Sequence, residues 1–145
     1  PIAIKEAQHR WYLIAEDNKN GQIRNFGFDR ITNLKILDSK FKSIVFDVQK
    51  NYQHAFGVET YEPIQKVVLE FSWQQGNYIK SFPLHTSQKI LSDSADALLI
   101  ELHIHPTNDI IMELLKYGSD VEVIEPPKLK NDIKKRISQM MKIYS

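Results

Sequence analysis

Two arginines and a tyrosine are the side chains best suited to bind an anion. Arg24 and Arg30 are six residues apart, so on a regular strand their side chains would share one face of a sheet. Two guanidinium groups on one face can each grip a phosphate through paired hydrogen bonds. Tyr12, on the neighbouring predicted strand, offers a ring for base stacking. The spacing therefore predicts a surface for single-stranded DNA, RNA or a nucleotide, with Arg10 and His9 at its rim.

A structural role for the same residues stays open. Phe26 and Phe28 would lie on the same strand face as the two arginines, because residues two apart on a strand point the same way. That face would then be partly core, unless a bend shifts the register. Arg30 could pair with Asp29 instead of a ligand, and Trp11 is expected in the core. In this alternative the arginines form salt bridges and the protein is a pure dimerisation or scaffold module.

A histidine cluster gives a weaker alternative, a metal-dependent enzyme. His103 and His105 point the same way on a strand, and His85 lies on the predicted neighbouring strand, which is a spacing that zinc sites use. No further ligand and no H-E-x-x-H motif accompanies them. The chain has no cysteine, no P-loop and no nucleophile elbow. We therefore expect no catalysis, no metal and no cofactor.

The composition is that of a globular protein with an uneven charge distribution. Of 145 residues, 42% are hydrophobic and 26% are charged. No apolar run reaches the roughly 18–20 residues that span a bilayer, and no secretion signal opens the chain, so we expect a cytoplasmic protein without membrane contact. The net charge is +3 over residues 1–46, −7 over residues 47–125 and +5 over residues 126–145. The basic front is the better candidate for an anionic ligand.

The first third of the chain has a β pattern. Residues 1–4 begin a strand, and two strands over 10–16 and 22–31 flank a turn rich in Asn and Gly. Short apolar runs at 34–37 and 42–46 predict two further strands. A short helix over 47–56 and a linker over 58–63 follow.

The rest of the chain alternates strands and helices. The predicted strands are 65–72, 84–91, 97–105 and 121–125, with a turn at 92–94, and the predicted helices are 74–82, 108–117 and 127–144. Asn108 is the expected N-cap of the second helix, and Gly118 follows its end. The order β-α-β-β-α-β plus a helix is the split βαβ pattern of a ferredoxin-like sheet.

An ordered set of short motifs resembles the WYL domain and its C-terminal extension, the WCX domain. The set spans nearly the whole chain and consists of Trp11-Tyr12-Leu13, Arg24-x-Phe26-x-Phe28-Asp29-Arg30-Ile31, Phe56-Gly57-Val58, His85-Thr86-Ser87-Gln88, Tyr117-Gly118-Ser119-Asp120-Val121-Glu122-Val123 and Glu125-Pro126. The resemblance implies an α+β chain in three parts. These are a partial Sm-like, SH3-type barrel over residues 1–46, a helix and linker over 47–63, and a ferredoxin-like extension with a C-terminal helix over 64–145.

The resemblance also implies a function. WYL domains are thought to sense a ligand and pass the signal to a winged-helix DNA-binding domain, and the extension commonly helps dimerisation. We therefore expect the ligand-sensing and dimerisation region of a bacterial transcriptional regulator, a homodimer whose anionic effector binds Tyr12, Arg24, Arg30, Arg10 and His9. The expected winged helix, and the barrel strands that should precede Pro1, are not in this sequence.

Overall fold

The computed structural model describes every residue from Pro1 to Ser145, in two compact units, residues 1–53 and 54–145. The two sheets are both antiparallel, and four α-helices accompany them, so the chain is an α+β protein as predicted. None of the four helices combines the length and the apolar composition needed to cross a membrane.

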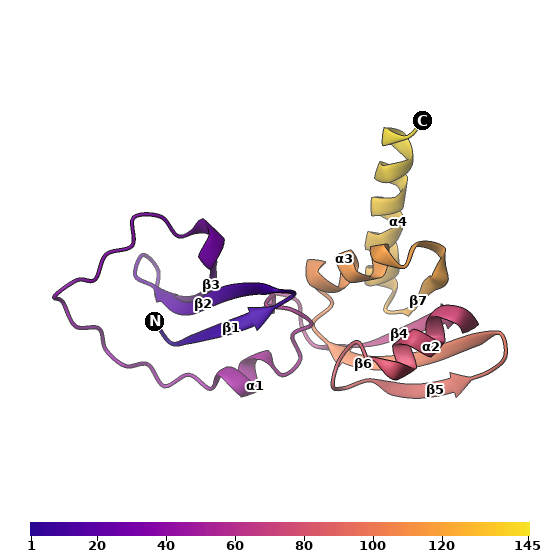
Figure 1. Ribbon diagram of the computed structural model, residues 1–145, viewed down its shortest axis with the longest axis horizontal. Helices are drawn as coiled ribbons and strands as arrows, with labels where there is room; N and C mark the ends of the chain where they lie inside the picture. Colours follow the sequence, from indigo (N-terminus) through magenta and orange to yellow (C-terminus); the bar gives the residue numbers. More distant parts are fainter. The chain divides into compact units, whose positions relative to one another are not determined.

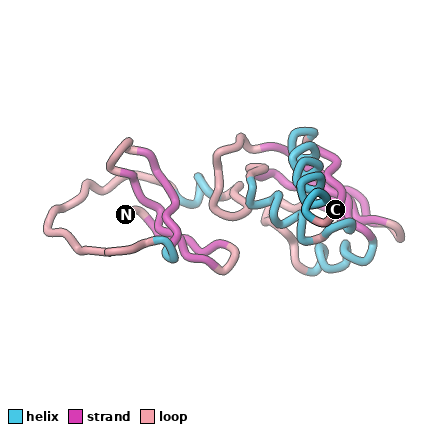
Figure 2. The backbone as a smooth tube through the Cα atoms, turned by 90° about the horizontal axis from the view of Figure 1, so that it is seen from above, coloured by secondary structure: helices cyan, strands magenta, loops and turns pink.

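The first unit is a three-stranded sheet followed by a long irregular segment. Its strands follow one another in the order β1-β2-β3, joined by two tight hairpins (Figure 1). Residues 31–47 contain no helix or strand and form the long loop in Figure 2. The elements are β1 (Ala3–Ala7), β2 (Arg10–Asp17), β3 (Gln22–Gly27), the 3-10 helix η1 (Phe28–Arg30) and α1 (Val48–Tyr52).

Four predictions for this unit are wrong in their bounds or altogether. The strand predicted to reach Ile31 ends at Gly27, because the chain turns into η1, where the Ile31 N–H donates to the Phe28 carbonyl at 3.2 Å. The predicted strands at 34–37 and 42–46 do not form. An apolar β pattern produces a strand only where another strand pairs with it. The predicted helix over 47–56 is limited to α1, residues 48–52.

The second unit has the predicted order of elements. Its sheet order is β5-β6-β4-β7, and every neighbouring pair is antiparallel. The elements are β4 (Gln65–Ser72), α2 (Trp73–Ser81), β5 (Lys89–Asp93), β6 (Ala97–Ile104), α3 (Asn108–Lys116), the 3-10 helix η2 (Gly118–Asp120), β7 (Val121–Glu125) and α4 (Pro127–Ile143).

The core of this unit lies on one face of its sheet. The register pairs Leu69 with Ile100 and with Val123, and all three side chains are at most 4% exposed. Because side chains alternate along a strand, the same face carries every second residue of β4 and β6. The three helices complete this core with Ile79 of α2, Ile110, Ile111 and Leu114 of α3, and Leu129 of α4.

Local hydrogen bonds explain the small differences from the predicted bounds. The strand predicted from Leu84 starts only at Lys89, because the Leu84 N–H donates to the Gln88 side chain at 2.9 Å and keeps this segment in a turn. The turn predicted at 92–94 lies two residues later, where the Ser94 N–H donates to the Ala97 carbonyl. The N-cap of α3 is Thr107, one residue before the predicted Asn108.

Substitution of Thr107, the N-cap of α3, is expected to cost no stability, unlike substitution of most helix caps. Its side chain is 1% exposed, and its hydroxyl makes no hydrogen bond, although this residue caps α3. Thr107→Val replaces that unpaired hydroxyl by a methyl group, so we expect the free energy of unfolding to stay constant or rise by about 1 kcal/mol. Urea unfolding followed by Trp73 fluorescence, in a Trp11→Phe background, measures this unit alone.

The matched control is the cap of α2. The Ser72 hydroxyl accepts from the Gln75 N–H at 3.3 Å and donates to Asp120 at 2.8 Å. Ser72→Ala should therefore lose about 1 kcal/mol, as a working cap does. A comparable loss for Thr107→Val would show that its hydroxyl has a partner after all.

Candidate functional site

The strand register separates the predicted anion-binding residues. Tyr12 pairs with Gly27, and Ala15 pairs with Arg24. Tyr12 and Ala15 are three residues apart on one strand, so their side chains, and those of their partners, lie on opposite faces of the sheet. The prediction that Arg24 and Arg30 share a strand face is also wrong, because Arg30 lies in η1 beyond the end of β3.

Each face can be defined by its residues. The tyrosine face consists of Lys5, Arg10, Tyr12, Ile14, Asn25 and Gly27, and the tryptophan face consists of Ile4, Trp11, Leu13, Ala15, Arg24 and Phe26. The five predicted site residues are therefore divided between the two faces, the first hairpin turn and η1.

Arg24 is engaged within its own hairpin. Its guanidinium lies 2.9 Å from the Asp17 carboxylate, and the Asp17 side chain is only 13% exposed. The backbone N–H of Lys19 donates to the same carboxylate at 3.0 Å. The hydrogen bond from Lys19, and then the one from Arg24, lower the pKa of Asp17. This pair fixes the turn between β2 and β3, so Arg24 has a structural partner already.

Arg10 is held much more loosely, on the tyrosine face. Its guanidinium lies 3.8 Å from the Asp29 carboxylate, and the two side chains are 62% and 59% exposed. An exposed ion pair at this distance contributes little to stability. Arg10 is therefore the arginine of this sheet that can change partners at least cost.

Asp29 and Tyr12 lie next to each other above Gly27. A Cβ atom added to Gly27 would lie 2.7 Å from Asp29 Oδ1 and 3.9 Å from Tyr12 Cε1. The Asp29 carboxylate thus occupies the space that a side chain at position 27 would fill, beside the tyrosine ring and near Arg10. The structure brings together Arg10, Tyr12 and a carboxylate, and sequence reasoning had considered Asp29 only as a partner of Arg30.

The other end of the tyrosine face is covered by α1. The Tyr52 hydroxyl donates to Asn25 Oδ1 at 2.5 Å, and the Lys5 ammonium lies 5.8 Å from the centre of the Tyr52 ring. Burial raises the pKa of Tyr52. Ile14 is completely buried on this face. Arg10, which is exposed, lies at the open end of the tyrosine face, next to the half-buried Tyr12.

The two remaining predicted residues flank the sheet. Arg30 is exposed in η1, directly after Asp29. His9 lies in the turn between β1 and β2 with a φ of 62°, and its N–H donates to Glu6 at 2.8 Å. The strand β2 starts one residue later, at Arg10.

The tryptophan face exposes apolar side chains. Trp11 is 55% exposed and Ile4 is 58% exposed. The expectation that Trp11 lies in the core is therefore wrong. Leu13 and Phe26 of the same face are half-buried. Exposed Glu6, which pairs with Trp11, and the Arg24–Asp17 ion pair lie on the same face, so charged groups flank this apolar surface.

The three histidines do not assemble a metal site. His103 Nε2 lies 2.9 Å from Glu101 Oε1, and the His105 ring bonds the Glu62 carbonyl at 2.5 Å. His85 Nδ1 lies 2.8 Å from the Ser87 hydroxyl. No group of three histidine or carboxylate side chains in residues 1–145 is arranged to hold a metal ion. The structure therefore does not bring His85, His103 and His105 together as ligands of one metal ion.

Comparison with known proteins gives two family matches. The model of the WCX domain matches residues 63–141, which is more than half of the chain, and the model of the WYL domain matches residues 1–36. No curated protein matches the chain. A similar solved structure is proteasome accessory factor B/C of Arthrobacter aurescens, with 20% sequence identity and a TM-score of 0.38. The alignment covers 89% of this chain and 20% of that one, so the chain spans about a fifth of its length.

Proposed function

Since the chain belongs to the WCX domain family and matches the WYL domain over residues 1–36, we propose that it is the ligand-sensing and dimerisation region of a WYL-type transcriptional regulator. In this proposal it has no catalytic role and works in the bacterial cytoplasm. An anionic effector, single-stranded DNA, RNA or a nucleotide, binds the first unit. A winged-helix DNA-binding domain of the same regulator responds to it.

The proposal includes a finer fold assignment. The first unit corresponds to part of an Sm-like barrel, and the second to a ferredoxin-like module with an added helix. The β-α-β-β-α-β order of the second unit supports the latter. In this proposal the chain is divided into the WYL part (residues 1–46), the helix and linker (47–63) and the extension (64–145).

The observation that carries the proposed site is the loose Arg10–Asp29 pair beside the Tyr12 ring. A phosphate can replace the Asp29 carboxylate as the partner of Arg10, because a phosphate offers the same acceptor geometry with more charge. The Tyr12 ring then stacks on a base. Arg30 and His9 extend the same surface, whereas Arg24 remains with Asp17 and contributes at most from the opposite face.

Such a ligand can regulate only through unequal affinities. The free energy by which binding favours one arrangement of the two units equals the difference between the ligand's binding free energies for the two arrangements. The bound and free states must therefore differ at the Arg10 and Tyr12 surface, and the DNA-binding domain must follow that difference.

Fluorescence anisotropy with a labelled single-stranded oligonucleotide tests this site. We expect Arg10→Ala and Arg30→Ala each to weaken binding by about five- to tenfold and to reduce the salt dependence by about one phosphate contact. Tyr12→Leu should weaken binding by about 1–3 kcal/mol, whereas Tyr12→Phe keeps the stacking ring and most of the affinity.

Arg24→Ala is the matched control, since it removes the same charge from the other face of the same sheet. Binding that is lost in Arg24→Ala but kept in Arg10→Ala would move the site to the tryptophan face. If wild-type protein shows no binding that falls with salt, the sensing function fails, and the pure dimerisation module becomes the better interpretation.

A further inference from the structure

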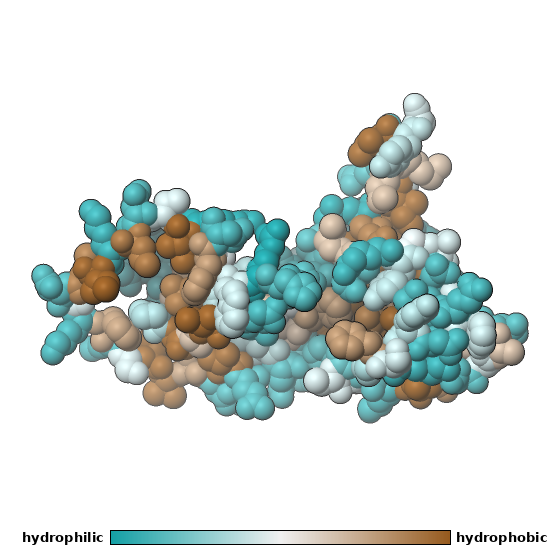
Figure 3. Space-filling model, in the orientation of Figure 1, coloured by the Kyte–Doolittle hydropathy of each residue, from teal (hydrophilic) through white to brown (hydrophobic).

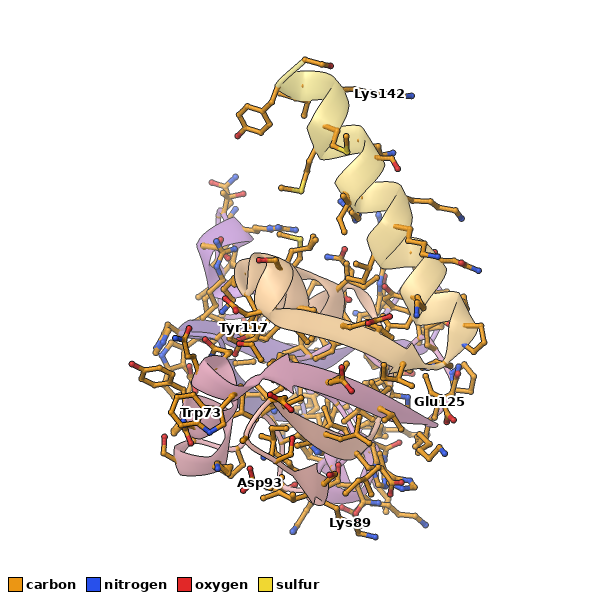
Figure 4. The ribbon with its side chains drawn as sticks, turned by 90° about the vertical axis from the view of Figure 1, so that its right-hand side faces the viewer. Trp73, Lys89, Asp93, Tyr117, Glu125 and Lys142 are labelled. Atoms are coloured by element: carbon orange, nitrogen blue, oxygen red, sulfur yellow. The ribbon has the colours of Figure 1, made fainter.

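An aromatic hollow lies on the surface of α2, in the second unit. Its volume is about 500 Å³, and its two rings remain open to water, with Trp73 50% exposed and Tyr78 70% exposed. In Figure 3 the surface over α2 is mostly teal and white, whereas apolar residues gather along α4. Figure 4 shows Trp73 at the edge of the unit, well away from α4. The lining residues are Trp73, Gln74, Gln75, Asn77, Tyr78 and Asp120.

The spacing along α2 and one contact from η2 position these side chains. Trp73 and Asn77 are four residues apart, as are Gln74 and Tyr78, so each ring has an amide as its neighbour on the helix surface. The Asp120 carboxylate is held at the start of α2, because its Oδ1 accepts a hydrogen bond from the Ser72 hydroxyl at 2.8 Å. The hollow therefore combines two aromatic faces, three amides and one carboxylate.

The charge of the hollow favours a cation. Asp120 is its only charged lining residue, and the carboxylate is exposed and forms no ion pair. The surrounding residues 47–125 have a net charge of −7. The N-terminus of α2 contributes only about half a positive charge, which the full charge of the carboxylate outweighs. An anion is repelled here, whereas a cation finds an unpaired carboxylate beside an aromatic ring.

We propose that this hollow binds a small organic cation that carries a guanidinium group. The planar guanidinium stacks on the indole of Trp73 and donates hydrogen bonds to the free Oδ2 of Asp120. The amide oxygens of Gln74 and Asn77 can accept from its remaining N–H groups. The volume is that of a small-molecule site. This site goes beyond the proposed anion site, which belongs to the first unit, and does not depend on it.

NMR titration of the isotope-labelled whole chain with agmatine and with N-carbamoylputrescine tests this proposal. The two molecules have nearly the same shape, but agmatine has a guanidinium where the other has a neutral urea group. We expect agmatine to shift the amide signals of residues 73–78 and 120 until saturation, with a Kd of about 1 mM. N-carbamoylputrescine should bind at least about tenfold more weakly, because its planar end lacks the charge.

Three variants identify the groups responsible. Asp120→Asn and Trp73→Leu should each weaken agmatine binding by about fivefold or more. Asparagine keeps an oxygen that can accept from Ser72, so this contact with α2 remains. Glu70→Gln is the matched control, since it removes an exposed carboxylate from the sheet face opposite the buried Leu69 and Phe71. It should change the Kd by less than about twofold.

Three results would overturn the site. The first is the absence of saturable shifts up to about 10 mM agmatine, ten times the expected Kd. The second is equal weakening by Asp120→Asn and Glu70→Gln, which would mean attraction to the overall charge and not to the hollow. The third is equal affinity for the two molecules, which would mean that the hollow takes a neutral planar group. Unchanged signals of the core residues show that each variant keeps its fold.

Discussion

Gly76→Ala is expected to lower the free energy of unfolding of the second unit by about 1–3 kcal/mol. Gly76 is buried in α2, and a Cβ atom there would lie 2.7 Å from the Cβ of Leu98 on β6. Both Cβ atoms are fixed by the backbone, so no rotamer change relieves the contact and the helix must move away from the sheet. The higher helix propensity of alanine returns only about 1 kcal/mol, so the clash decides the sign.

Asn77→Ala is the control for this substitution. Asn77 is the next residue of α2 and is exposed, so the same new side chain meets no neighbour there. Its helix propensity alone predicts a small gain in stability, up to about 0.7 kcal/mol. Urea unfolding followed by Trp73 fluorescence compares both variants. A gain of the same size for Gly76→Ala would mean that α2 and β6 are farther apart than described.

Gly57→Ala is expected to cost about 2–3 kcal/mol because it competes with Asp109 for one position. The Asp109 carboxylate accepts hydrogen bonds from the backbone N–H groups of Val58 and Glu59, at 2.9 and 3.0 Å. A Cβ atom on Gly57 would lie 2.5 Å from the same carboxylate oxygen. Alanine therefore displaces the carboxylate, and two buried or half-buried N–H groups lose a charged acceptor.

A double-mutant cycle checks this explanation. In an Asp109→Ala background the carboxylate is gone, so we expect Gly57→Ala to cost less than about 1 kcal/mol there. Chemical unfolding of the four proteins gives the coupling energy. Equal costs of Gly57→Ala in both backgrounds would show that position 57 excludes alanine for another reason.

The second unit could be predicted largely from local patterns. The strand over Val121–Glu125 has the predicted bounds, and α4 differs from its prediction by one residue. The strand β6 alternates regularly between buried and half-buried residues, and Gly118, with a φ of 57°, ends the preceding helical segment as predicted. Predictions failed where one residue decides a hydrogen bond, as in the cap of α3, because Thr107 and Asn108 are both acceptable caps.

The candidate site could be predicted only in part, because strand register is not a local property. Tyr12 and Arg10 lie on one face of the sheet and Arg30 follows it in η1, but the side of the sheet on which Arg24 lies depends on which residue it pairs with. A shift of one residue moves every side chain of a strand to the other face. The hairpin that pairs Ala15 with Arg24 could not be read from spacing alone. The predicted strands at 34–37 and 42–46 failed because pairing is equally non-local.

The Asp29 carboxylate acts as an internal competitor for any molecule that seeks Arg10. A monocarboxylate that replaced it would exchange one negative charge for another and gain almost nothing, whereas a phosphate adds charge at the same position. If the proposed site binds an anion, this corner of the sheet therefore favours phosphates over small carboxylic acids without any steric barrier. Removing the Asp29 carboxylate, and not enlarging the opening, is the change that would let the proposed site accept small carboxylic acids as well as phosphates.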